Sequence, residues 1–161
     1  MQLWVLIKKN GTLKQQKKKI FSLKNVKPFW IEEPLYPFDL NSYSKLKSST
    51  RTEIAFGECF SNYEQFEYSC DYNCCTFLQP DVTLLGIRDF IKVNKLAGKF
   101  KKKIAIHVWG SPLSLMISLH MALACKNVSF IEVPRIKNNN FLKFSKIFKL
   151  DRYGKIKFAN L

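Results

Sequence analysis

The sequence predicts an α/β fold in which parallel strands alternate with helices, as in part of a (β/α) barrel. Five short apolar runs stand out: "PFWIEE", "TEIAFGE", "TFLQPD", "KIAIH" and "VSFIE". Each run ends on an ionisable residue, and these residues follow one another at intervals of 23 to 26 positions. Stretches of helical length separate the runs. Short apolar strands separated by helices are typical of a parallel sheet that is buried on both faces.

The ionisable residues that end the five runs are the candidate functional residues. They are, in chain order, Glu32, Glu58, Asp81, His107 and Glu132. In a (β/α) barrel the carboxyl ends of the strands converge on one central cavity, where active sites are built. One polar residue at a strand end needs no functional explanation, but five in series predict a site.

The segments between and around the runs predict the remaining elements. Residues 12–26 predict a helix, with no complete strand before it. The segment "LLGIRDFIKVNKLAGKF" has apolar residues at helical spacing, and Gly98 is well placed to end that helix. The last segment, 141–161, predicts a hairpin-like tail with a turn near residues 151–154. We therefore expect one partial barrel domain over residues 1–161.

The residue types at the strand ends predict a metal-assisted acid–base site. Glu32 and Glu58 offer the hard oxygen ligands that Mg²⁺ prefers. Asp81 and His107 could form a carboxylate–imidazole pair, in which the acid fixes the tautomer and raises the basicity of the ring.

The loop after His107 offers further candidates. Trp109 and Ser111 could line a substrate pocket, with simple packing as an equal alternative for Trp109. Glu33, next to Glu32, is expected to shape the loop with Pro34.

Composition excludes several other classes of protein. No apolar run is long enough to span a bilayer and no export signal is present, which predicts a soluble, cytoplasmic protein without membrane contact. The five cysteines are an odd number, so we expect reduced thiols. The cluster "CDYNCC" lacks the second Cys/His pair that a structural zinc site requires.

The net charge of +15 raises the alternative of a basic nucleic-acid-binding protein. Only four of the 27 basic residues are arginine, and the lysines are spread along the chain. Arginine makes most bidentate contacts with phosphates and base edges, so this pattern favours a solvated surface over a nucleic-acid interface.

Five motifs in order resemble a known family: "FWIEEPL", "IAFGE", "QPDVTLLGIRDFIKVNKLA", "HVWGSPLSLMISLHMALA" and "FIEVP". They are similar to the C-terminal barrel of the enolase superfamily, of the mandelate racemase and muconate lactonizing enzyme type, in its acid-sugar dehydratase branch. The resemblance implies a Mg²⁺-dependent lyase or isomerase that removes the proton next to the carboxylate of a sugar acid.

The resemblance also assigns roles to the candidate residues. Glu32 and Glu58 match the metal-binding glutamates at the ends of the family's fourth and fifth barrel strands. Asp81 and His107 match the Asp–His dyad of the sixth and seventh strands, in which the histidine moves the proton. Glu132 matches an acid on the eighth strand that hydrogen-bonds the developing enediolate.

Departures from the family pattern imply a truncated protein. The family's third metal ligand, an aspartate, lies in a stretch that this sequence matches only from "MQLW". The Lys-x-Lys motif, the first three barrel strands and the capping domain have no counterpart. Five strands would leave two open edges and an exposed interior face. We therefore expect a chain that is inactive alone, with a non-catalytic half that completes a barrel with a complementary N-terminal half as an alternative.

Overall fold

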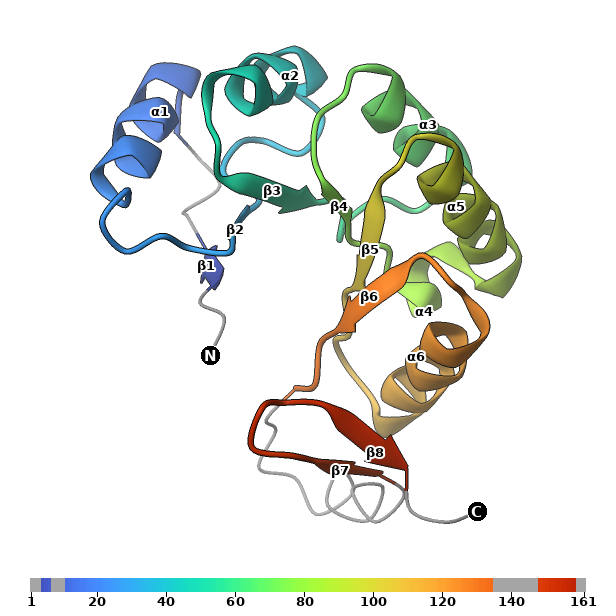
Figure 1. Ribbon diagram of the computed structural model, residues 1–161. Helices are drawn as coiled ribbons and strands as arrows, with labels where there is room; N and C mark the ends of the chain where they lie inside the picture. The colour runs from blue at the N-terminus through green and yellow to red at the C-terminus, as the bar shows by residue number, and fades with distance from the viewer. Residues whose placement is uncertain (1–3, 7–10, 135–147, 159–161) are drawn as a thin grey trace.

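Six parallel strands form one curved sheet, with the helices along its outer side (Figure 1). The computed structural model describes residues 4–6, 11–134 and 148–158. The six strands pair in chain order. In sequence, the elements are β1 (Trp4–Leu6), α1 (Leu13–Ser22), β2 (Trp30–Glu32), α2 (Leu40–Ser49), β3 (Glu53–Phe56), α3 (Tyr63–Asp71), β4 (Phe77–Leu78), α4 (Val82–Leu85), α5 (Ile87–Lys99), β5 (Lys103–Ile106), α6 (Pro112–Ala124), β6 (Val128–Ile131), β7 (Phe148–Leu150) and β8 (Ile156–Phe158). The predicted α/β fold with a parallel sheet is confirmed.

The strand β1 precedes the first helix, where the sequence pattern predicts no complete strand. It pairs in parallel with β2, so that Trp4 lies opposite Trp30 and Leu6 opposite Glu32. Of the described residues at this end of the chain, three have strand geometry, which is too short for an alternating pattern to be recognised. The expectation of five strands, numbered four to eight of a barrel, is therefore corrected to six.

Two helices end at positions other than the expected ones. The helix α1 starts at a capping box made by Thr12 and ends at Ser22 instead of residue 26. The helix α5 runs through Gly98 to Lys99. A Cβ atom on Gly98 would lie 3.1 Å from the side-chain nitrogen of Asn127, in the loop before β6. The glycine therefore permits a close contact between this loop and α5 instead of ending the helix.

The two faces of the sheet are buried by different partners. On the outer face, strand residues such as Ile31, Ile54 and Ile104 pack with helix residues such as Tyr43 and Phe90 in one large core. On the inner face, a second core contains four strand residues, Trp30, Ala55, Phe77 and Ala105, with Phe29 and Phe130 packed against them. The alternation of side chains along each strand sends neighbouring residues to opposite cores.

The aromatic cluster, which we define as Phe29, Trp30, Phe77 and Phe130, fills the inner face below the strand ends. The ring centroids of its members lie 5.0 to 5.7 Å apart, in the tilted and edge-on arrangements that aromatic rings prefer. Trp30 is only 6% exposed and Phe77 only 2%. The expectation of an exposed interior face is therefore wrong, because side chains from β2, β4 and β6 meet across the curve of the sheet.

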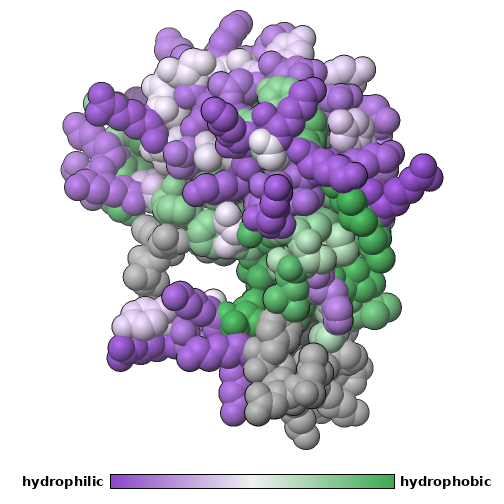
Figure 2. All heavy atoms as spheres, turned by 45° about the vertical axis from the view of Figure 1, so that its right-hand side comes forward, coloured by the Kyte–Doolittle hydropathy of each residue, from purple (hydrophilic) through white to green (hydrophobic). Residues whose placement is uncertain are grey.

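The outer surface is uneven in polarity. Figure 2 shows hydrophilic residues over most of the upper part and apolar residues gathered lower down. The helix α6 has no Lys, Arg, Asp or Glu, and it leaves Leu113 and Leu123 more than 60% exposed. Among the described helices, none is both long enough and apolar enough to cross a membrane.

The strands β7 and β8 form a separate antiparallel pair, with Phe148 opposite Phe158. The turn between them is held by Asp151, whose Oδ1 accepts hydrogen bonds from the backbone N–H groups of Tyr153 and Lys155, each at 2.9 Å. Phe148 is buried and belongs to the large core, which connects this pair with the rest of the molecule.

Candidate active site

The five candidate residues all lie at the carboxyl ends of the parallel strands. Glu32 is the last residue of β2, and Glu132 directly follows β6. Glu58, Asp81 and His107 lie within three residues of the ends of β3, β4 and β5. Because neighbouring parallel strands end at the same edge of the sheet, these side chains share one side of the molecule.

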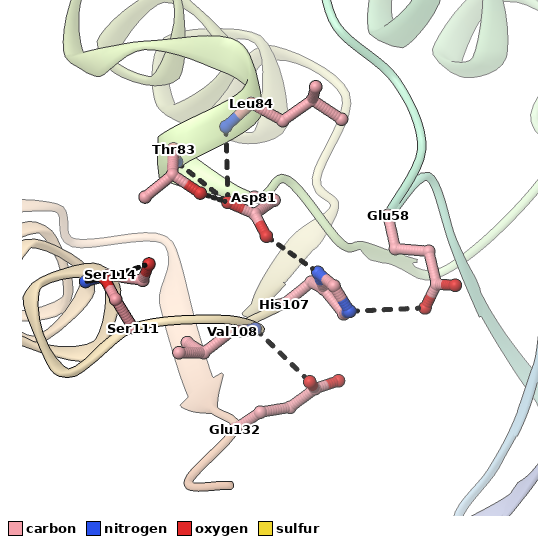
Figure 3. A network of polar contacts seen from close by, with 9 residues as sticks. All are labelled: Glu58, Asp81, Thr83, Leu84, His107, Val108, Ser111, Ser114 and Glu132. Carbon is pink, nitrogen blue, oxygen red and sulfur yellow. Dashed lines mark hydrogen bonds and ion pairs between the residues drawn. The ribbon is translucent and has the colours of Figure 1, made fainter. Parts of the chain in front are cut away.

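Asp81 and His107 form a hydrogen-bonded pair (Figure 3). The Nδ1 atom of His107 lies 2.9 Å from Oδ2 of Asp81, and an isolated parallel bridge joins the two backbones. The other oxygen, Oδ1, accepts hydrogen bonds from the N–H and hydroxyl of Thr83, at 2.8 and 2.6 Å, and from the N–H of Leu84 at 3.3 Å. Asp81 thus caps α4 with one oxygen and holds the imidazole with the other.

The ionisation of this pair follows from those contacts. Burial alone would raise the pKa of Asp81, but its hydrogen bonds with His107 and Thr83 outweigh burial and hold the pKa below its ordinary value. Burial alone would lower the pKa of His107, but its hydrogen bond with Asp81 and the charges of Glu132 and Glu58 raise it instead. The Nε2 atom of His107 lies 3.7 Å from Oε2 of Glu58. With Nδ1 donating to Asp81, Nε2 is the nitrogen that can take up a proton.

Replacing Asp81 by asparagine tests this account of the histidine. Asp81→Asn removes the charge and weakens the hydrogen bond, so the pKa of His107 should fall from its raised value, because burial is then opposed only by the charges of Glu132 and Glu58. The chain has only two histidines, so both ring signals can be assigned in an NMR titration. His120 is exposed on α6, and its ring signal serves as the internal control. An unchanged His107 curve in Asp81→Asn would contradict the account.

Glu132 lies on the other side of His107. Burial raises its pKa to about 7, with further increases from the charges of Glu32 and Glu58, although the charge of His107 and a hydrogen bond from the N–H of Val108 oppose the increase. The distance from that nitrogen to Oε2 of Glu132 is 3.3 Å. Near neutral pH this carboxyl group is therefore partly protonated and can donate a hydrogen bond.

Glu32 is 5% exposed and lies within reach of a side chain from β4's carboxyl end. Its Oε2 accepts a hydrogen bond of 2.9 Å from Nε2 of Gln79. Burial raises the pKa of Glu32, hydrogen bonds with the side chains of Gln79 and Trp30 oppose this, and the charges of Glu58 and Glu33 add to the increase. Glu32, Glu58 and Glu132 therefore experience one another as like charges.

The comparisons with known proteins agree with this geometry. A family model described as "Enolase C-terminal domain-like" matches residues 8–151. The chain belongs to the enolase superfamily. The curated L-talarate/galactarate dehydratase of Salmonella typhimurium is 33% identical over 131 residues, which cover 78% of this chain and 32% of that enzyme. The chain thus spans about a third of the length of the curated relatives it matches.

Solved structures of the superfamily have the same fold. A mandelate racemase/muconate lactonizing enzyme-like protein from Roseovarius sp. TM1035 gives a TM-score of 0.88 at 19% identity, covering 96% of this chain and 39% of that one. The 3,6-anhydro-D-galactonate cycloisomerase of Zobellia galactanivorans gives 0.86 at 22% identity, covering 99% and 45%. The predicted resemblance to the acid-sugar dehydratase branch of the superfamily is confirmed.

The carboxylates at the strand ends are of the donor type that a hard divalent cation binds. Carboxylate oxygens are the ligands that Mg²⁺ prefers, and a cation would relieve the mutual repulsion of Glu32, Glu58 and Glu132. Within residues 4–6, 11–134 and 148–158, no group of three His, Cys, Asp or Glu side chains lies close enough together to hold a metal ion. Glu32 and Glu58 remain the two residues we expect to bind Mg²⁺.

The two predicted substrate-binding residues make none of the contacts described for Glu58, His107 and Asp81. Trp109 is on the surface, 69% exposed. Ser111 caps α6, with its Oγ accepting from the N–H of Ser114 at 3.3 Å and lying 3.2 Å from the Ser114 Oγ. Figure 3 shows Ser111 and Ser114 to the left, away from the line formed by Glu58, His107 and Asp81. Their role in substrate binding stays a prediction.

Two buried residues of the site were not predicted from the sequence as functional. Gln79 donates a hydrogen bond to Glu32. Its position two residues before Asp81, in "QPD", could have indicated a place in the site, because alternate residues of an extended segment share a face. Glu33 is fully buried, and its Oε1 accepts a hydrogen bond of 3.3 Å from the N–H of Gly57. This contact joins the end of β2 to the backbone directly before Glu58.

Proposed function

We propose that this chain carries the acid–base pair and two metal ligands of a Mg²⁺-dependent enzyme that removes the proton next to the carboxylate of a sugar acid. The observation that carries the proposal is the position of His107, hydrogen-bonded to Asp81 on one side and 3.7 Å from Glu58 on the other, at the carboxyl ends of the strands. The dehydratases named among its relatives support a sugar-acid substrate.

Each residue has a separate part in the proposed reaction. The Nε2 atom of His107 takes the proton, because Nδ1 is committed to Asp81. The negative charge of Asp81 stabilises the imidazolium that forms. Glu132, with a pKa of about 7, donates a hydrogen bond to the negative charge that develops on the substrate. Glu32 and Glu58 would hold Mg²⁺, which would supply Lewis-acid stabilisation of the substrate carboxylate when bound.

Cation binding tests the metal part of the proposal. Glu32→Gln and Glu58→Gln should each weaken the binding of Mn²⁺, used as a probe for Mg²⁺, by at least about tenfold, because each removes a charged oxygen ligand. Titration calorimetry and electron paramagnetic resonance measure the affinity. Glu64→Gln is the matched control, since Glu64 is exposed on α3. Equal affinities in all four proteins would contradict the assignment of Glu32 and Glu58.

We further propose that the chain alone does not turn over. A complete barrel builds its active-site mouth from eight strands, and the sheet described here has six. The assay incubates the full chain with Mg²⁺ and a panel of sugar acids, and measures dehydration and exchange of the proton next to the carboxylate in D₂O. If the unmodified chain turned over robustly and His107→Asn abolished that turnover, the proposed inactivity would be refuted and the role of His107 supported. If His107→Asn left robust turnover intact, both the proposed inactivity and the role of His107 would be refuted.

A further inference from the structure

Gln79 is the buried polar residue whose contacts the proposed reaction leaves unexplained. It follows β4 directly, and its backbone N–H donates to the carbonyl of Phe56 at 3.0 Å, which continues the pairing with β3. Its side chain is fully buried. One end of the amide, Nε2, donates to Glu32, while Oε1 has no hydrogen-bond partner among the described residues. A buried acceptor without a donor is rare in native proteins and calls for an explanation.

The contact between Gln79 and Glu32 crosses the strand that lies between them. In the register of the sheet, Ala55 of β3 lies opposite Glu32 on one side and opposite Phe77 on the other. Ala55 faces the inner core and has only a methyl group. The small side chain on β3 therefore leaves open the path along which the long side chains of Glu32 and Gln79 meet.

This contact fixes one oxygen of a buried carboxylate. Glu32 is 5% exposed, and its Oε2 is engaged by Gln79 at 2.9 Å. A carboxylate that binds a cation needs its free oxygen directed at the ion, and neighbouring hydrogen-bond donors commonly provide that orientation. The second amide atom of Gln79 is buried beside the same carboxylate and needs a donor that the described protein atoms do not supply.

We propose that Gln79 is a positioning residue for cation binding. Its Nε2 orients Glu32, and its Oε1 accepts a hydrogen bond from a water molecule or hydroxyl group that accompanies the bound cation. The inference rests on the proposed function, because it takes Glu32 to be a metal ligand. It adds a residue of β4's carboxyl end to a site otherwise built from the ends of β2 and β3.

The test compares two substitutions of fully buried glutamines. Gln79→Met keeps the length of the side chain and removes both hydrogen-bonding atoms, and Gln16→Met does the same in α1. Mn²⁺ affinity should fall about 10- to 100-fold in Gln79→Met and stay unchanged in Gln16→Met. The thermal midpoints of the metal-free proteins report the loss of stability from each substitution, which a purely structural glutamine would also show.

A double-mutant cycle shows whether Gln79 acts through Glu32. If it does, Gln79→Met should weaken Mn²⁺ binding less in a Glu32→Gln background than in the unmodified chain, because the part that passes through Glu32 is already lost. Additive losses, or an unchanged affinity in Gln79→Met while Glu32→Gln weakens binding, would overturn the role of Gln79 and leave the metal site standing. Absence of any Mn²⁺ binding by the unmodified chain would overturn both proposals.

Discussion

Replacing Phe77 by alanine is expected to lower the free energy of unfolding by about 3–5 kcal/mol, among the largest effects of any single substitution in this chain. Phe77 is 2% exposed and lies at the centre of the aromatic cluster, with its ring centroid 5.0 Å from that of Trp30 and 5.7 Å from those of Phe29 and Phe130. Removing it leaves a cavity on the inner face that three large rings cannot fill by small movements.

Urea unfolding followed by circular dichroism measures this effect. Phe21→Ala is the matched control, because Phe21 in α1 is 68% exposed and its replacement should change the free energy of unfolding by no more than about 0.5 kcal/mol. If Phe77→Ala were as mild as Phe21→Ala, the inner face would not be the packed core described above.

The second large effect concerns pH. The free energy of unfolding of the unmodified chain should fall as the pH rises, and Glu132→Gln should make this fall smaller. Burial raises the pKa of Glu132 from 4.5 to about 7, so the folded state holds a proton that the unfolded state releases. This carboxyl group therefore contributes stability that is fully present below about pH 4.5 and is lost as the pH rises through about 7. The size of the full contribution is about 3–4 kcal/mol, from roughly 1.4 kcal/mol for each pKa unit, and about 2–3 kcal/mol of it is lost between pH 5 and pH 8.

The histidine acts in the same direction over a neighbouring range. The pKa of His107 is raised above its ordinary 6.5, so its stabilising contribution is present below that value and is lost as the pH rises through the folded-state pKa. Because the charge of Glu132 is one cause of that increase, the difference between Glu132→Gln and the unmodified chain reports the carboxyl group together with its effect on His107.

The measurement is urea unfolding at pH 5 and pH 8 in the presence of a chelator, so that no metal ion neutralises the carboxylates. The unmodified chain should lose stability between the two values, and Glu132→Gln should lose about 2–3 kcal/mol less. The matched control is Glu64→Gln, at an exposed position, which should keep the pH dependence of the unmodified chain. A pH dependence that is equal in all three proteins would show that Glu132 ionises with an ordinary pKa.

The sequence was sufficient for the parts of the fold that depend on local pattern. The apolar runs around Ile31, Ile54 and Ile104 predicted strands, and the ionisable residues after them identified the edge of the sheet where Asp81 and His107 meet. Parallel strands place their carboxyl ends together whatever the details of packing, so spacing along the chain was enough.

The parts that could not be predicted depend on contacts between distant residues. The interior was expected to be exposed because five strands leave a barrel open, and nothing local in the sequence indicates that Trp30, Phe77 and Phe130 meet on the inner face. The hydrogen bond between Glu32 and Gln79 joins residues 47 positions apart. The predicted end of α5 was wrong because Gly98 permits a close contact with Asn127. A glycine that ends a helix and a glycine that permits a close contact look the same in the sequence.

The short helix α4 has a consequence for the basicity of His107. It comprises four residues, and its first turn is held by the oxygen of Asp81 that faces away from the imidazole. Single helical turns open at low free energy compared with global unfolding. If this turn opened, Asp81 would lose the N–H donors of Thr83 and Leu84, which hold its Oδ1, and its carboxylate would be less firmly fixed beside the imidazole. The basicity of His107 therefore depends on an intact helical turn that lies outside the strands that carry the site.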